Sequence, residues 1–235
     1  MPRSKRARRL ALHGTTTKTR QEKAKMIELV RSFLPPKHTK IYVFEYGDIR
    51  NQSLKEFREE VKRLPEGGGR LFLGSNRVLQ VALGRSPEEA LAPELHQLGE
   101  KLRGKRGLLF CSAPHVLVQE LFANFERREY ARAGTIAPED VRLAVGEPLE
   151  DLPASSGPKL RELGLPISLR GGRLFLDVIA GPDKHFLICS KGEILSAEQC
   201  VLLRMLGIRL ATARLHLRYR WDAEHCKVEE LGDQE

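Results

Sequence analysis

Apolar residues recur at helical spacing in the first hydrophobic stretch of the chain and stop at a proline pair. Residues 26–34 place their apolar side chains on one side of a helix, and Pro35-Pro36 ends the pattern. The cations Lys23, Lys25 and Arg31 lie away from that apolar stripe. The pattern therefore predicts a helix that anchors one face in a core and offers another face to an anion.

Short β-branched and aromatic runs then alternate with helical patterns. Strands are predicted at residues 40–46, 70–74 and 107–112, and Gly67-Gly68-Gly69 predicts the turn before the second strand. A helical pattern follows each of these strands. This alternation is typical of an α/β domain in which helices flank a central sheet.

Two of these helices carry recognisable start signals. Ser53-Leu54-Lys55-Glu56 has the form of a capping box, which predicts that a helix begins there. Ser86-Pro87-Glu88-Glu89 combines an N-cap residue, a first-turn proline and an acid. We therefore expect a second helix from there to about Arg103, with Leu91 on its apolar side.

The composition changes after residue 134. Prolines and glycine pairs become frequent as far as residue 195, and the strand-like pieces are short. A helix is then expected to begin at the capping box Ser196-Ala197-Glu198-Gln199 and to end at Gly207. This segment predicts a second, smaller module.

Residues 211–221 alternate between apolar and basic positions, which predicts a half-buried strand. Leu215, Leu217 and Tyr219 fall on one face, and arginines with His216 fall on the other. Two interpretations of the cationic face stay open: contact with RNA, or an edge strand protected by charge. A strand this far from the first sheet would complete that sheet, so the proline-rich module would be an insertion.

The predicted fold class is therefore α/β, with a layered domain of central sheet and flanking helices interrupted by a smaller α+β insertion domain. We expect a basic N-terminal arm at residues 1–17. The α/β domain is expected at residues 18–131 plus 207–235, and the insertion domain at residues 132–206. Both boundaries follow the change in composition.

Charge is concentrated at the N-terminus. Residues 1–25 hold nine Lys or Arg and one acid, so they carry +8 of the chain's net charge of +9. Such a segment favours a polyanionic partner, because cations neutralise phosphates and release their counterions. The run PRSKRARR also suits a nuclear localisation signal, and the two roles are compatible.

Composition excludes several classes of protein. No run of about 18 apolar residues is present, so no membrane span is expected. The charged start argues against secretion. The cysteines are scattered without a C-x-x-C pair, which indicates a reducing compartment and no zinc site. They are Cys111, Cys189, Cys200 and Cys226.

No motif for catalysis or for a cofactor stands out. Gly67-Gly68-Gly69 and Gly74-Ser75-Asn76-Arg77 match neither the P-loop nor the dinucleotide-binding spacing. His115 lies near Cys111 in sequence, but a buried thiol and a loop imidazole explain that pair. Asp177 and Asp183 have no acid or base partner. We therefore expect no enzyme activity, no cofactor and no metal.

Anion binding is better supported. Gly74-Ser75-Asn76-Arg77 falls at a strand-to-helix junction, where backbone amides and the helix dipole favour an anion. Arg50-Asn51 occupies the equivalent position after the preceding strand. Together with the arm and the first helix, these junctions would form one cationic edge suited to folded RNA. The alternative is that Asn51 and Asn76 only cap helices.

Ordered motifs along nearly the whole chain match a known family. They are MPRSKRARR at the start, Ile49-Arg50-Asn51, GSNRVLQVALGRSPEE at 74–89, LHQLGEKLRGKRGLLF at 95–110, Tyr130-Ala131-Arg132-Ala133-Gly134, LRELGLP at 160–166 and RYRWD at 218–222. In these motifs the chain resembles the mRNA turnover protein 4 family of ribosome assembly factors. That family is paralogous to the large-subunit stalk-base ribosomal protein.

The resemblance implies an rRNA-binding α/β domain with an insertion, and assembly of the nuclear pre-60S particle. It implies binding to the GTPase-associated region of large-subunit rRNA at the stalk base, as a placeholder for the ribosomal stalk protein. The particle and the neighbouring stalk-base ribosomal protein are the expected partners, without a membrane or acidic stalk-protein dimers. The expected location is the nucleolus and nucleus, and passage to the cytoplasm on pre-60S particles stays open.

The residues expected to contact rRNA combine the basic arm, the first helix and the two junctions. They are Arg3, Lys5, Arg6, Arg8, Arg9, Lys18, Lys23, Lys25, Arg50, Asn51, Lys55, Gly74, Asn76 and Arg77. The family usually has lysine at the position of Ser75, so one phosphate contact there is left open.

Two other functions were weighed against this one. The first is the stalk-base ribosomal protein itself in a tail-less form. The chain stops at Glu235, soon after Trp221, without the stalk-recruiting helices and acidic tail of the eukaryotic protein, which favours the assembly factor. The second is an RNA-modifying or nucleotide-using enzyme, for which the sequence offers no cofactor loop and no catalytic set.

Overall fold

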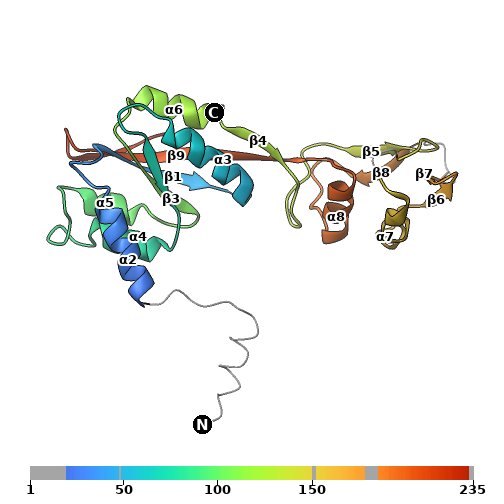
Figure 1. The fold of residues 1–235 in the computed structure, drawn as a ribbon, viewed down its shortest axis with the longest axis horizontal. Helices are drawn as coiled ribbons and strands as arrows, with labels where there is room; N and C mark the ends of the chain where they lie inside the picture. Colours follow the sequence, from blue (N-terminus) through green and yellow to red (C-terminus); the bar gives the residue numbers. More distant parts are fainter. Residues whose placement is uncertain (1–19, 48, 150–151, 178–184, 233–235) are drawn as a thin grey trace, which may run out of the picture. The chain divides into compact units, whose positions relative to one another are not determined.

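The computed structural model describes residues 20–47, 49–149, 152–177 and 185–232 of the 235-residue chain. The chain divides into two compact units, each of which is described by itself (Figure 1). The first holds the residues up to Phe125 and those from Arg214 onward, and the second holds Glu126–Ala213. The second unit is thus inserted in the sequence of the first. Among the described helices, none has the length and apolar character needed to cross a membrane.

The first unit is built on a sheet with the strand order β10-β9-β1-β3-β2. Its strands are β1 (Lys40–Tyr46), β2 (Gly69–Phe72), β3 (Arg106–Cys111), β9 (Ala211–Asp222) and β10 (Lys227–Glu230). All neighbours in this order are antiparallel, so β1 and β2, which flank β3, run in the same direction. The pairing of β9 with β1 confirms that the last long strand completes the first sheet.

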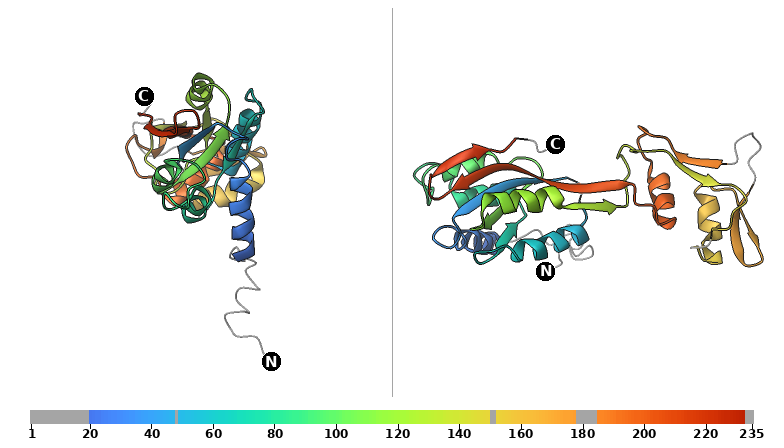
Figure 2. Two further views of the ribbon diagram at one scale, coloured as in Figure 1. Left: turned by 90° about the vertical axis from the view of Figure 1, so that its left-hand side faces the viewer. Right: turned by 90° about the horizontal axis from the view of Figure 1, so that it is seen from above.

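Helices cover both faces of this sheet (Figures 1 and 2). One face carries α2 (Arg20–Arg31), α4 (Asn76–Leu83) and α5 (Leu95–Glu100), and the other carries α3 (Asn51–Lys62) and α6 (His115–Asn124). On the α3 and α6 face, the Phe122 ring lies 5.7 Å from Phe44 and 4.9 Å from Phe57 between centroids. The layered α/β architecture predicted from the sequence is confirmed.

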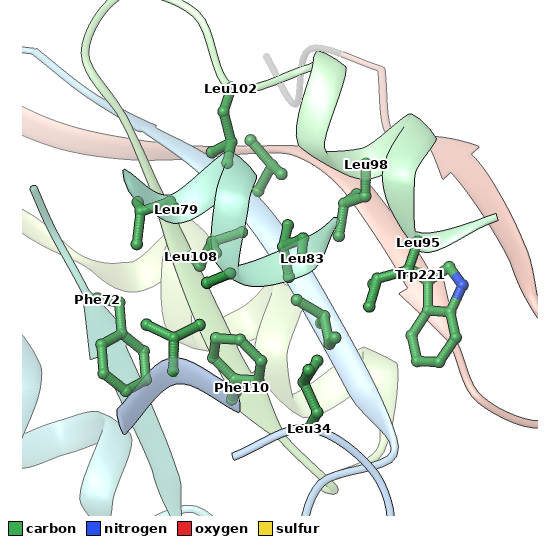
Figure 3. Close-up of a cluster of buried hydrophobic side chains, with 14 residues drawn as sticks. Leu34, Phe72, Leu79, Leu83, Leu95, Leu98, Leu102, Leu108, Phe110 and Trp221 are labelled. Carbon is green, nitrogen blue, oxygen red and sulfur yellow. The ribbon is translucent and has the colours of Figure 1, made fainter. Parts of the chain in front are cut away.

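Leucines of α4 and α5 dominate the core on the first face (Figure 3). Leu83 and Leu95 pack there with Phe110 of β3 and with Trp221 near the end of β9. The indole N–H of Trp221 donates a hydrogen bond of 3.0 Å to the carbonyl oxygen of Pro93. This bond fastens the end of β9 to the segment that precedes α5.

A β-bulge in β9 breaks the alternation predicted from the sequence. Val43 of β1 pairs with Tyr219, but the next residue, Phe44, pairs with Leu217, so Arg218 is an extra residue. Side chains beyond the bulge therefore change faces. Tyr219 packs against the core of Figure 3, whereas Leu217 lies on the side of Phe44. The prediction that Leu217 and Tyr219 share a face is wrong.

The interpretation of β9 as an edge strand is also wrong. It lies inside the sheet, because β1 and β10 pair with its two sides. Two of its arginines form ion pairs with carboxylates: Arg218 Nε lies 3.0 Å from Glu45 Oε2, and Arg220 Nη2 lies 2.8 Å from Glu229 Oε2. The cationic face of the strand therefore serves cross-strand ion pairs within the sheet.

Both helix starts predicted in the first unit are wrong. The N-cap of α3 is Arg50, so Ser53 lies buried inside the first turn and forms no capping box. Residues 86–94 form turns, and α5 begins only after them. A helix through this segment would include Pro93, which lacks an amide proton and crowds the preceding turn. Leu91 is accordingly 59% exposed.

The second unit is an α+β domain with a core of its own, as predicted. β5 (Val141–Ala144) pairs with β8 (His185–Cys189), and β6 (Ile167–Arg170) pairs with β7 (Arg173–Leu176). The unit also contains β4 (Glu126–Glu129), the 3₁₀ turn η1 (Ala154–Ser156), α7 (Gly157–Glu162) and α8 (Ala197–Met205). The predicted capping box is confirmed, because Ser196 and Gln199 exchange both of its hydrogen bonds at the start of α8.

We predict that Trp221→Ala lowers the free energy of unfolding by about 3–5 kcal/mol, because it removes a large side chain from a closed core. Urea unfolding followed by far-ultraviolet circular dichroism measures this, since the variant lacks the chain's single tryptophan. Leu91→Ala is the control and should change stability by no more than about 0.5 kcal/mol, because Leu91 is exposed. Equal unfolding midpoints for the two variants would contradict the packing described.

Candidate nucleic-acid interface

The two strand-to-helix junctions singled out in the sequence lie at the same end of the sheet. β1 and β2 are both antiparallel to β3, so both end where β3 begins. Arg50 follows β1 and begins α3, and Gly74 follows β2 just before α4. The topology therefore places the two junctions at one edge, on either side of the loop that leads into β3.

That loop, residues 103–106, was missed as part of the site. Its carbonyl groups hold both junctions: Tyr46 N donates to Lys105 O at 3.0 Å, and Asn76 Nδ2 donates to Gly104 O at 2.9 Å. Arg103 and Lys105 are exposed. The basic run Arg-Gly-Lys-Arg before the third predicted strand could have indicated an anion-binding loop. Only strand pairing shows that this run lies beside the two junctions.

The helices α3 and α4 both begin at this edge. Arg50 and Ser75 are the N-cap residues, and neither side chain bonds to first-turn amides. Asn51 and Asn76 are the first helical residues, so the alternative that they cap the helices is wrong. The positive ends of both helix dipoles favour an anion at this edge. Arg77 is exposed beside them.

Helix α2 passes beside the second of these junctions. A Cβ atom built on Gly74 would lie 3.9 Å from Cε of Met26. At the other end of α2, Arg31 donates from Nε to Ala82 O and from Nη2 to Val81 O, at 3.3 and 3.2 Å. These bonds hold α2 along α4, so the exposed cations Lys23 and Lys25 extend the cationic edge.

The remaining predicted residues divide into two groups. Lys55 lies exposed on α3, close after the first turn. Five cations of the arm, and Lys18 directly after it, lie outside the described residues: Arg3, Lys5, Arg6, Arg8, Arg9 and Lys18. The described site thus comprises Lys23, Lys25, Arg50, Asn51, Lys55, Gly74, Asn76 and Arg77, with Arg103 and Lys105 added by the structure.

The carboxylate at the end of β1 is neutralised from two sides. Glu45 Oε2 lies 3.0 Å from Arg218 Nε and 3.9 Å from Arg106 Nη2. Arg106 also donates from Nη1 to Lys101 O at 2.7 Å, which fixes its guanidinium at the base of the loop. This pairing offsets the negative charge that would otherwise oppose a phosphate at the same edge.

The contacts of the possible catalytic residues noted in the sequence explain these residues without catalysis. Burial raises the pKa of the Cys111 thiol to about 12, so the thiol stays protonated at neutral pH. The nearby His115 bonds through Nδ1 to the Tyr42 hydroxyl, 3.1 Å away, rather than to a nucleophile. Asp177 accepts bonds from Ser168 and Arg170. Asp183 lies outside the described residues.

One cluster of potential metal ligands lies in the turn between β9 and β10. Oxygen or nitrogen atoms of Asp222, Glu224 and His225 lie within 4.8 Å of one another. Asp222 Oδ1 already accepts a hydrogen bond from Glu224 N at 3.0 Å, as in an ordinary Asx turn. The cluster therefore has a structural explanation without an ion.

Comparison with known proteins adds two kinds of similarity. Residues 18–127 match the family described as ribosomal protein L10, and residues 131–208 match the insertion domain in 60S ribosomal protein L10P. Ribosome assembly factor mrt4 of Neurospora crassa is 33% identical, over 98% of this chain and 94% of that protein. Its Dictyostelium discoideum counterpart is 29% identical over the whole of both chains. The large ribosomal subunit protein uL10 of Thermococcus onnurineus is 22% identical, over 75% of this chain and 49% of that protein.

We predict effects of different size for two glycine substitutions around β2. A Cβ atom at Gly69 would lie 2.8 Å from Val61 Cγ1 and 3.2 Å from Phe110 O, so Gly69→Ala should lower the free energy of unfolding by about 1–3 kcal/mol. Among the described residues, a Cβ atom at Gly74 meets only Met26, so Gly74→Ala should change this free energy by no more than about 0.5 kcal/mol. Urea denaturation of both variants measures the difference. A loss in Gly74→Ala as large as that in Gly69→Ala would show that the junction is packed more tightly than described.

Proposed function

This chain belongs to the Mrt4 family of ribosome assembly factors, and on that basis we propose that it is an assembly factor of the pre-60S ribosomal particle. The observation that carries the proposal is similarity along nearly the full length of both chains, with 33% identity to the Neurospora crassa factor. The match to uL10 is lower and spans about half of that protein. This difference favours the assembly factor over a tail-less ribosomal protein.

We further propose that the chain binds large-subunit rRNA at the stalk base and occupies the site later taken by the ribosomal stalk protein. Similarity to the L10 family supports a shared rRNA site, because the match covers the unit that bears the cationic edge. At that edge, two helices begin side by side, and Arg77 and Arg103 are exposed. Such groups bind phosphates in a fixed arrangement, which suits folded RNA.

The contacts assigned to rRNA are Arg50, Asn51, Gly74, Asn76 and Arg77, with Lys23, Lys25 and Lys55 beside them. Gly74 lets the phosphate backbone approach closely, because it carries no side chain and is exposed. The five basic residues of the arm, together with Lys18, supply additional, less selective phosphate affinity, and the arm supplies nuclear delivery. Ser75 offers a hydroxyl in place of the lysine that is usual in the family.

In this proposal the chain works by occupancy and carries no catalytic step. It acts in the nucleolus and nucleus, bound to the particle beside the neighbouring stalk-base ribosomal protein. Release from the particle would free the rRNA for the stalk protein, and passage to the cytoplasm before release is part of the proposal. Family membership and the structural roles of the described His, Cys and Asp groups support a binding protein.

We predict that changing Arg50, Asn51 and Arg77 together to Ala weakens binding to a stalk-base rRNA fragment by about 10- to 100-fold. Removing two cations should also flatten the dependence of log Kd on log salt by about two. Equilibrium binding at several salt concentrations measures both effects. The matched control changes Asn124, Arg161 and Arg173 to Ala, three exposed residues that are not among the contacts assigned to rRNA. Wild-type affinity in the first variant at equal salt would refute the assigned contacts.

We predict that the full chain sediments with pre-60S particles of nuclear extracts and not with polysomes. An assembly factor leaves the particle before translation, whereas a ribosomal protein remains on it. Sucrose-gradient fractions probed for the chain measure the distribution, with a mature large-subunit protein as the polysome marker. Strong association with polysomes would support the ribosomal-protein alternative instead.

A further inference from the structure

A cavity lies between α4 and α5, next to the cationic edge but distinct from the two junctions. Its volume is about 440 Å³, within the range of small-ligand sites. Figure 1 shows the two helices side by side on one face of the first unit. Its lining combines residues from both helices and from the turn after α4: Arg77, Gln80, Gly84, Arg85, His96, Gly99 and Glu100.

Two buried glycines let the backbone pack closely at the inner wall of this cavity. A Cβ atom at Gly99 would lie 3.6 Å from Gly84 O and 3.9 Å from Gln80 Cα, so the backbones of the two helices meet there. Gly84 has φ +101°, and a Cβ atom at that position would lie 2.6 Å from Ala90 Cα. The two glycines therefore fix the close approach of α4, α5 and the turn that connects them, and the polar side chains around them remain to meet a ligand.

Polar groups line this cavity in a combination that suits one nucleotide. Arg77 is exposed in the first turn of α4, and Arg85 is exposed directly after the Gly84 C-cap of that helix. His96 Nδ1 is buried and has no hydrogen-bond partner among the described residues. Glu100 offers an exposed carboxylate. Gln80 is fixed by its bond from Nε2 to Leu102 O at 3.2 Å.

A buried, unpaired imidazole nitrogen is unfavourable unless a ligand or water completes its hydrogen bond. The two guanidinium groups at the ends select an anionic ligand, and the carboxylate accepts from an amino or imino group. A base joined to phosphates combines the anionic groups, the amino or imino group and a hydrogen-bond partner for the imidazole in one molecule. The shared residue Arg77 makes the cavity continuous with the edge assigned to rRNA.

We propose that this cavity binds one unstacked nucleotide of the rRNA. The base enters the cavity, where it meets His96 and Glu100, and Arg77 and Arg85 bind the flanking phosphates. Sequence-selective recognition of RNA uses such splayed-out bases, whereas phosphate contacts alone fix only register. The inference rests on the proposed rRNA binding and adds to it a source of base selectivity.

The test compares Arg85→Ala and His96→Leu, separately and together, with Arg63→Ala, an exposed cation at the end of α3. The double variant should bind the stalk-base rRNA fragment about tenfold more weakly than wild type, the order expected for loss of one base contact. The control should retain wild-type affinity. Far-ultraviolet circular dichroism of each variant checks the fold, and His96→Gln replaces His96→Leu if the latter fails to fold.

Cross-linking gives an independent readout on the wild-type chain. RNA carrying 4-thiouridine in place of uridine, cross-linked by light, should attach within residues 77–100. Unchanged affinity in the folded variants, or cross-links confined to the junctions, would overturn the inference and leave the rRNA proposal standing. Failure of the wild-type chain to bind the fragment would overturn both.

Binding of free nucleotides tests whether the cavity takes a nucleotide of the rRNA or a free mononucleotide. Addition of AMP, GMP, CMP or UMP at millimolar concentration should shift the His96 ring resonances weakly, because the cavity is expected to need the flanking RNA for affinity. Micromolar binding of any of the four would identify the cavity as a site for a free nucleotide and overturn its assignment to rRNA.

Discussion

The pairing of β9 with β1 is the interaction on which the rest of the first unit depends. It joins residues that are far apart in the sequence and closes a loop that contains the whole insertion. Its contacts must offset the entropy lost on closing that loop, a cost that grows only with the logarithm of the loop length. The bulge at Arg218 then turns Tyr219 and Trp221 into the core beneath α4 and α5. The same pairing places Arg218 on Glu45 and neutralises the acid at the edge that we assign to rRNA.

The direction of the strands determines where the cationic edge forms. β1 and β2 run in the same direction because both are antiparallel to β3, and this brings the starts of α3 and α4 together. The loop before β3 lies between them and is held by Tyr46 and Asn76. Few charges are needed in such a site, because oriented backbone amides supply part of the positive potential.

The proposed recognition therefore separates affinity from selectivity. The basic arm holds most of the chain's net charge and can bind any polyanion, with an affinity that falls as salt rises. The folded edge fixes the register of phosphates on rigid helices. The cavity between α4 and α5 would add contacts to a base, where His96 Nδ1 and the Glu100 carboxylate offer hydrogen bonds. These three layers differ in how strongly they respond to salt and to base identity.

Sequence alone determined the fold class, the insertion, most strands and the position of the two junctions. It did so because hydrophobic periodicity and turn residues act locally: the run at 40–46 and the capping box at Ser196 need no distant partner to be recognised. The predictions from sequence were wrong where contacts between residues far apart in the chain determine the local structure. A strict alternation in β9 gave way to a bulge, which only pairing with β1 makes visible. The helix expected from Ser86 gave way to turns, with Pro93 held by Trp221 from the other end of the chain. The loop at 103–106 carries a basic run, but only strand pairing places that run between the two junctions, and the cavity beside Gly99 forms only where α4 and α5 meet.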